Sequence, residues 1–153
     1  LIKERRTGRT GGKGGFYTRT RDAEGKTVRR AIDLATGEDR PEARVTLESL
    51  ELRDLRQVAE HPDRGGRYVR AVLLETLSYA ASLVPEIADD VASVDAAMRL
   101  GYNWRWGPFE LIDRLGASWL AAALREAGRP VPRLLEQVGD GTFYRVQDGM
   151  PQY

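Results

Sequence analysis

The sequence has no cysteine and only one histidine, His61, among its 153 residues. Disulfides, thiolate nucleophiles and zinc–thiolate sites are therefore excluded. A transition-metal site would have to be built mostly from carboxylates, and no cluster of carboxylates with suitable spacing is present in the sequence. The lack of cysteine fits a reducing compartment, so we expect a cytoplasmic protein.

Long apolar runs are lacking too. No stretch reaches the roughly 18 apolar residues that a membrane-spanning helix needs, and the N-terminal residues lack the apolar segment of a signal peptide. With 41% hydrophobic and 31% charged residues, the composition is that of a globular domain, and no membrane partner is expected. The sequence begins at Leu1 rather than at methionine, so we expect it to be a piece of a longer protein.

The charges nearly balance, at a formal net charge of +1, but they are unevenly distributed. Residues 1–30 contain ten Lys and Arg against three Asp and Glu, whereas the remainder contains 14 against 20. A basic end could meet the phosphates of nucleic acid or of a coenzyme. These basic residues are neither carried on a helix nor interleaved with aromatic residues. A solvated terminus is therefore favoured, and no nucleic-acid partner is expected.

The hydrophobic pattern predicts two regions, a β-like segment over residues 1–45 and a helical domain over residues 46–153. In the first, a glycine-rich loop at 11–15 ends where Phe16 and Tyr17 enter a core, and strands follow at 16–20 and 27–32. In the second, helices are predicted at about residues 46–61, 63–84, 87–100, 108–115, 119–127 and 132–138. Residues 142–146 read as a strand, which could pair with the strands at the other end of the chain.

Three details of the helical region can be predicted from single residues. The helix that Asp63 caps carries apolar residues nearly all round, which indicates a central helix buried on most sides. Gly101 stands where a left-handed residue would end the next helix. Pro108 suits the first turn of the helix after that, because its missing N–H would have had no partner there.

No segment of the chain qualifies as a catalytic or cofactor-binding motif. The glycine cluster at 11–15 has neither the spacing of a phosphate-binding loop nor that of a dinucleotide fingerprint. His61 lies at a helix junction, where a histidine more often caps a helix than acts as a base. Asp89 and Asp90 lie at a helix start, where carboxylates favour the helix dipole. We therefore expect no catalytic, cofactor-binding or metal-binding residue in this chain.

The most informative stretch, residues 94–116, reads as a helix, an aromatic loop and a second helix. Its two tryptophans flank Arg105 and could stack on an adenine or line an acyl groove, or they could hold two helices together. The candidates for a substrate cleft or a domain contact are Tyr102, Asn103, Trp104, Trp106, Pro108 and Phe109.

This stretch resembles the signature helical hairpin of the C-terminal domain of 3-hydroxyacyl-CoA dehydrogenases. The likeness rests on Asp95, Ala97-Met98, Gly107-Pro108-Phe109-Glu110-Leu111, Asp113 and Gly116. Residues 12–17 resemble the end of a first copy of that domain, and residues 68–89 resemble the opening helix of a second copy. The resemblance covers about residues 8–150. This combination of segments is similar to that in long bacterial fusions of the dehydrogenase with an enoyl-CoA hydratase.

The resemblance implies a mainly α fold with short β-hairpin elements at the ends. It also implies a bacterial parent enzyme that oxidises (3S)-3-hydroxyacyl-CoA with NAD in fatty-acid β-oxidation. In that family the dinucleotide-binding domain and a His–Glu dyad lie upstream, and no residue here matches them. NAD would therefore be bound by another domain, and this piece alone is expected to be inactive.

The piece would then support the acyl-CoA cleft and contact the preceding copy of the helical domain or a second subunit. The alternative is a helical protein–protein interaction or dimerisation module without a catalytic role.

Overall fold

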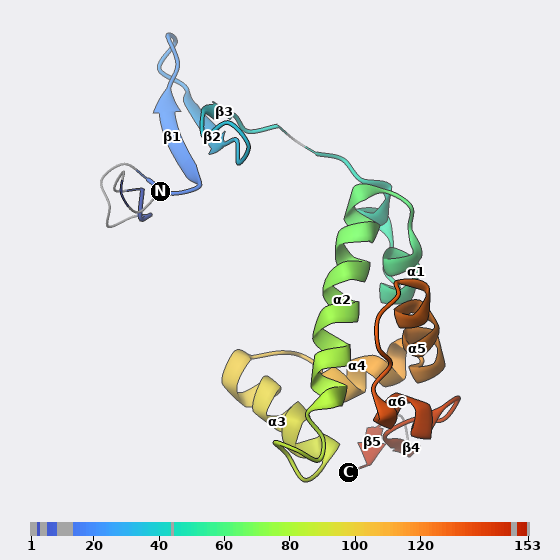
Figure 1. Cartoon of the computed structure of the whole chain (residues 1–153). Coiled ribbons are helices and arrows are strands. Elements are labelled where there is room, and N and C mark those ends of the chain that lie inside the picture. The colour runs from blue at the N-terminus through green and yellow to red at the C-terminus, as the bar shows by residue number, and fades with distance from the viewer. Residues whose placement is uncertain (1–2, 4–5, 9–13, 44, 148–149, 153) are drawn as a thin grey trace. The chain divides into compact units, whose positions relative to one another are not determined.

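The computed structural model describes residues 3, 6–8, 14–43, 45–147 and 150–152. The chain divides into two compact units, Leu1–Thr46 and Leu47–Tyr153, each of which is described by itself. Helices predominate and two small antiparallel sheets accompany them, so the predicted mainly α fold with short hairpins is confirmed (Figure 1). None of the described helices combines the length and apolarity needed to cross a lipid bilayer.

The first unit is a three-stranded antiparallel meander of β1 (Tyr17–Arg21), β2 (Thr27–Ile32) and β3 (Asp39–Pro41). The two predicted strands are confirmed to within one residue, and β3 is additional. A turn joins β1 to β2, and there the Asp22 carboxylate accepts the Lys26 N–H at 2.7 Å. Phe16 and Tyr17 are exposed, so their predicted place in a core was wrong within this unit. Residues 11–13 of the glycine loop lie outside the described residues.

The predicted helix over 46–61 is divided into η1 (Glu48–Glu51) and α1 (Leu55–Glu60). Asp54 explains the division, because its side chain accepts the Gln57 N–H at 2.9 Å and starts a new helix. An N-cap must itself be extended, so the chain cannot remain helical through that position. A single helix across 46–61 was therefore wrong.

Helix α2 (Arg64–Ser82) begins at the predicted cap, where Asp63 accepts the Gly66 N–H at 2.8 Å. Its buried face contributes Leu74, Leu77 and Ala81 to the core. On the rest of the helix, Tyr68 is 70% and Tyr79 63% exposed, so the prediction that α2 is buried on most sides was wrong within this unit. Helix α1 and η1 contact the start of α2, and α4 (Pro108–Leu115), α5 (Ala117–Glu126) and α6 (Arg133–Val138) cover its core-facing side, so the side that carries Tyr68 and Tyr79 stays exposed.

The core of the second unit forms where α4, α5 and α6 meet α2. The predicted apolar side of α4, Phe109, Ile112 and Leu115, is confirmed, since each of these side chains is at most 1% exposed. Phe143 packs edge-on against Phe109, with ring centroids 4.9 Å apart. Gly116, at φ 95°, ends α4 as predicted.

The C-terminal strand is shorter than predicted. It begins at Arg145 rather than Thr142, and β4 (Arg145–Gln147) pairs with β5 (Met150–Gln152) of the same unit. The later start has a physical reason, because a side chain instead of a strand binds the backbone N–H groups of Phe143 and Tyr144. Pairing between the two ends of the chain stays a prediction.

Candidate functional site

The aromatic loop joins α3 (Val91–Tyr102) to α4. Helix α3 begins at Asp90, whose carboxylate accepts the Ser93 N–H at 2.7 Å, as the capping interpretation of the Asp89–Asp90 pair predicts. The helix continues through Gly101, and Asn103 adopts the left-handed conformation that ends it, at φ 56°. The prediction that Gly101 ends this helix was therefore wrong. Asparagine can take this role because its short polar side chain tolerates the left-handed region.

A buried carboxylate, Asp95, holds the start of α4. Its side chain is fully buried and accepts the backbone N–H groups of Phe109 and Glu110 at 2.8 and 2.9 Å. Those are two of the N–H groups that a helix start leaves without intrahelical partners. Asp95 on α3 thus caps α4 from the neighbouring helix.

Gly107 makes room for this cap. A Cβ atom at Gly107 would lie 2.3 Å from both Cβ and Cγ of Asp95. The φ angle of Gly107 is −72°, which any residue adopts, so the requirement for glycine is one of space rather than of backbone freedom.

Glu110 completes the capping arrangement. Its carboxylate turns back to accept the Gly107 N–H at 2.7 Å and forms an ion pair with Arg99 at 2.9 Å. In a usual capping box the N-cap side chain supplies the other half, but Gly107 has none. Asp95 supplies it here, so the box is shared between two helices.

A second carboxylate, Asp113, fixes the C-terminal segment. It accepts the N–H groups of Phe143 and Tyr144 at 2.8 and 3.0 Å, and the Tyr144 hydroxyl donates to Asp95 at 2.9 Å. Burial raises the pKa of Asp95 and of Asp113, because desolvation outweighs the hydrogen bonds that favour their charged forms. These carboxylates are committed to backbone N–H groups and serve the fold.

The structure divides the predicted site residues into two groups. Pro108 and Phe109 are fully buried in the core, where no ligand reaches them. Tyr102 is 73% exposed, Asn103 is exposed, and Trp104 and Trp106 are half-buried at the surface of the hairpin. The guanidinium carbons of Arg105 and Arg114 lie 4.4 and 4.0 Å from the centroid of the Trp106 ring.

Sequence reasoning missed the roles of Asp95, Glu110, Asp113 and Tyr144. One signal was available, because Glu110 stands at the third helical position after Gly107, where a capping box places its acid. The other three roles depend on contacts 14 to 49 residues apart, which no local spacing reveals.

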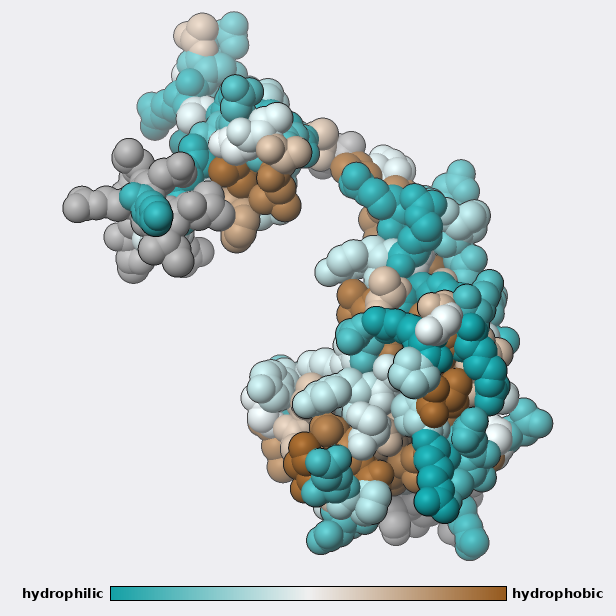
Figure 2. Space-filling view, viewed as in Figure 1, coloured by the Kyte–Doolittle hydropathy of each residue, from teal (hydrophilic) through white to brown (hydrophobic). Residues whose placement is uncertain are grey.

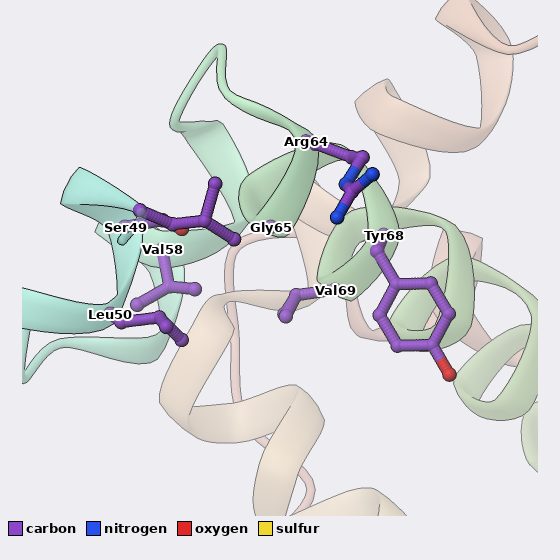
Figure 3. Close-up of a pocket in the computed structure, with 8 residues that line it drawn as sticks. Ser49, Leu50, Val58, Arg64, Gly65, Tyr68 and Val69 are labelled. Atoms are coloured by element: carbon purple, nitrogen blue, oxygen red, sulfur yellow. The ribbon is translucent and has the colours of Figure 1, made fainter. Parts of the chain in front are cut away.

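An apolar groove of about 400 Å³ lies between η1–α1 and the start of α2. Its lining consists of Leu47, Ser49, Leu50, Val58, Arg64, Gly65, Tyr68 and Val69. Figure 3 shows Leu50 and Val58 projecting from one side and Val69, Tyr68 and Arg64 coming from α2. The groove could accept an apolar chain or side chain, and the hydroxyl-bearing Ser49 in its lining is only 1% exposed.

His61 lies at the junction of α1 and α2, where its backbone N–H caps α1 as predicted. Its imidazole nitrogens lie 3.6 Å from Glu48 and 3.3 Å from Asp63. Partial burial acts to raise the pKa of Asp63, but hydrogen bonds from Gly66 and Ser49 and the nearby His61 lower it well below its usual range. Asp63 therefore remains a charged cap, so the pair serves the helix junction.

The described strands do not form the βαβ unit of a dinucleotide-binding fingerprint. A dinucleotide fingerprint requires a strand, a glycine-rich turn and a helix leading to a parallel strand. The described strands pair only in antiparallel fashion. Within the described part of the chain, no group of three or more His, Cys, Asp or Glu side chains could hold a metal ion. The fold and the α3–α4 hairpin thus define a small helical domain. Its buried carboxylates, Asp95 and Asp113, bind backbone N–H groups and hold its segments together.

The comparisons assign this domain to a family. The model of the 3-hydroxyacyl-CoA dehydrogenase C-terminal domain matches residues 66–150, which include the whole α3–α4 hairpin. The chain therefore belongs to this family, and the resemblance predicted from the hairpin is confirmed.

Much longer proteins contain segments that are similar in sequence to this chain. A "Probable 3-hydroxyacyl-CoA dehydrogenase" of Bacillus subtilis is 37% identical over 94 residues, 60% of this chain and 12% of the relative. A "Putative fatty acid oxidation complex trifunctional enzyme" of Rickettsia felis is 33% identical over 146 residues, 95% of this chain and 20% of the relative. The chain thus spans no more than 20% of the length of these two relatives. No solved structure matches.

Proposed function

We propose that this chain is the non-catalytic C-terminal part of an NAD-dependent 3-hydroxyacyl-CoA dehydrogenase of bacterial fatty-acid β-oxidation. The observation that carries the proposal is the family match over the capped hairpin, residues 66–150. The names of the relatives point to the same activity. The substrate would be a 3-hydroxyacyl-CoA in the cytoplasm, and both NAD and the reacting groups would be held by another domain of the parent enzyme.

Within that enzyme the domain would support the acyl-CoA cleft and contact the preceding copy of the helical domain or a second subunit. Helix α2 offers a suitable surface, because Tyr68, Val72 and Tyr79 follow one another at helical spacing and are all exposed. Brown, apolar residues are visible on the surface of the helical unit in Figure 2. Exposed apolar side chains of this kind mark sites that a partner covers.

The test is acetoacetyl-CoA-dependent oxidation of NADH by the isolated chain. The rate should equal that of a heat-denatured sample, because the described residues offer neither a dinucleotide fold nor a positioned base in a cleft. A rate clearly above the denatured control would contradict the non-catalytic role.

The same exposed face on α2 also favours the alternative, a helical interaction or dimerisation module without any catalytic role. Light scattering of the isolated chain examines this alternative. A dimer that dissociates when Tyr79 is replaced by Lys would show that the face serves self-association, whereas a monomer at all concentrations would weigh against it.

A further inference from the structure

Two arginines stack on the half-buried ring of Trp106. Arg105 precedes the tryptophan, and Arg114 comes from the last turn of α4, with guanidinium carbons 4.4 and 4.0 Å from the ring centroid. Both arginines are exposed. Neither has a carboxylate oxygen within 4.0 Å among the described residues. A preference for cations at helix C-termini accounts for Arg114 but not for Arg105.

The acids of the hairpin do not neutralise this cluster. Asp95 is buried against the start of α4, Glu110 is paired with Arg99, and Asp113 binds the backbone of Phe143 and Tyr144. All three carboxylates of the hairpin are therefore engaged by partners within the domain. The outward surface at Trp106 retains two uncompensated positive charges.

Stacking leaves these guanidinium groups able to bind a ligand. A guanidinium that lies on an aromatic ring uses its flat face, so the N–H donors in its plane remain available. The two guanidinium carbons lie 4.4 and 4.0 Å from one ring centroid, so their separation is limited, and an anion at the edge of the ring with oxygens at both ends could accept from both groups. The backbone N–H groups of Arg105 and Trp106 likewise have no acceptor within the described part of the chain. Guanidinium forks beside free backbone N–H groups are a common setting for phosphate.

We propose that Arg105, Trp106 and Arg114 form a binding site for the phosphate groups of a nucleotide-type ligand. A phosphate or diphosphate offers three or more charged oxygens and can engage two guanidinium groups at once, whereas a carboxylate offers only two oxygens and a single negative charge. The assignment to a nucleotide rests on the proposed function, since an acyl-CoA thioester carries both a diphosphate and a 3′-phosphate. The cluster would hold that part of the substrate away from the reacting carbon.

The experiment is an NMR titration of the whole chain with pyrophosphate, coenzyme A and dephospho-coenzyme A at ~0.1 M salt. The Nε–H signals of Arg105 and Arg114 and the indole N–H signal of Trp106 should shift and saturate. The double variant Arg105→Gln/Arg114→Gln should weaken the binding of coenzyme A at least ~10-fold. Arg105→Lys/Arg114→Lys keeps the charges but not the planar forks, and it should give an intermediate loss.

The matched control is Arg53→Gln/Arg133→Gln, which removes the same charge from two exposed arginines without an ion pair among the described residues. It should change the affinity by less than about twofold, as expected for screened surface charges. The proposal is overturned if no signal saturates, if the control loses as much affinity as the double variant, or if a glutamate-rich peptide binds there as tightly as pyrophosphate.

These outcomes are independent of the NADH assay. Pyrophosphate binding that depends on the two arginines supports the site even if the proposed dehydrogenase role fails. Coenzyme A that binds more tightly than pyrophosphate, and more tightly than dephospho-coenzyme A, supports the nucleotide assignment. Equal affinities for all three ligands would contradict that assignment.

Discussion

Replacing Gly107 with alanine places a methyl group where helix α3 already lies. The new Cβ would be 2.3 Å from Cβ and Cγ of Asp95 and 2.5 Å from its Cα. The Cα is backbone, so a change of rotamer cannot relieve the overlap. The helices α3 and α4 must separate, and Asp95 then loses its hold on the N–H groups of Phe109 and Glu110.

The loss of stability follows from two effects of moving α3 and α4 apart. Overpacking a tight contact costs about 1–3 kcal/mol, and weakening hydrogen bonds to a charged group costs about 1.5–3 kcal/mol each. The effects overlap, so we expect Gly107→Ala to lower the free energy of unfolding by about 3–5 kcal/mol. For a chain of this size the midpoint of thermal unfolding should fall by ~6–20 °C.

The assay is urea and thermal unfolding followed by circular dichroism and tryptophan fluorescence. Gly101→Ala is the matched control, because Gly101 lies inside α3 and an added Cβ there meets nothing within 4 Å. That change should leave stability unaltered or raise it by up to ~1 kcal/mol through helix propensity. Equal stabilities of the two variants would refute the reasoning that Gly107 is required for space.

Three further predictions concern the anchored C-terminal segment and the two units. Tyr144→Phe removes the hydroxyl that donates to Asp95, and urea unfolding should show a loss of about 1–3 kcal/mol. Burial raises the folded-state pKa of Asp113 above 3.8, so its contribution is largest below that pH and is lost as pH rises through the folded pKa. The stability advantage of the wild type over Asp113→Asn should therefore be largest below pH 3.8 and shrink as the pH rises above it. Deletion of residues 1–46 should leave the melting temperature within a few degrees, because every described buried core residue lies in Leu47–Tyr153.

One control variant and two opposite outcomes test these predictions. Tyr102→Phe alters an exposed hydroxyl and should be neutral, so an equal loss in both tyrosine variants would contradict the role of Tyr144. An advantage over Asp113→Asn that grew with pH would reverse the assigned direction of the pKa shift. Unfolding of the shortened chain at room temperature would show that residues 1–46 contribute to the core.

Features that depend on one helical turn could be predicted from the sequence. Asp63 and Asp90 cap helices at the expected positions, and Pro108 begins α4. In each case the cause lies within three residues of the effect. The family could be identified for a related reason, since the hairpin residues that carry the resemblance all lie within one short stretch of the sequence, from Asp95 to Gly116.

Features that depend on distant neighbours could not be predicted. The burial of α2 requires knowing which helices cover it, and its apolar sequence alone indicated burial on most sides. Asp95 reads as a polar residue on an amphipathic helix until α4 is placed beside it. The C-terminal strand was predicted too early in the sequence because Asp113, about 30 residues away, binds the N–H groups that a strand would have used.

The capped hairpin also explains why the resemblance identifies a domain rather than a reaction. Asp95, Gly107 and Glu110 carry the resemblance, and each of them is used to join α3 to α4. No side chain between residues 104 and 106 takes part in that capping arrangement. The arginines around Trp106 lie on the outside of the same joint, free of its internal bonds. A ligand-binding role for this domain is therefore best sought on that outer surface, where side chains are not already committed to the fold.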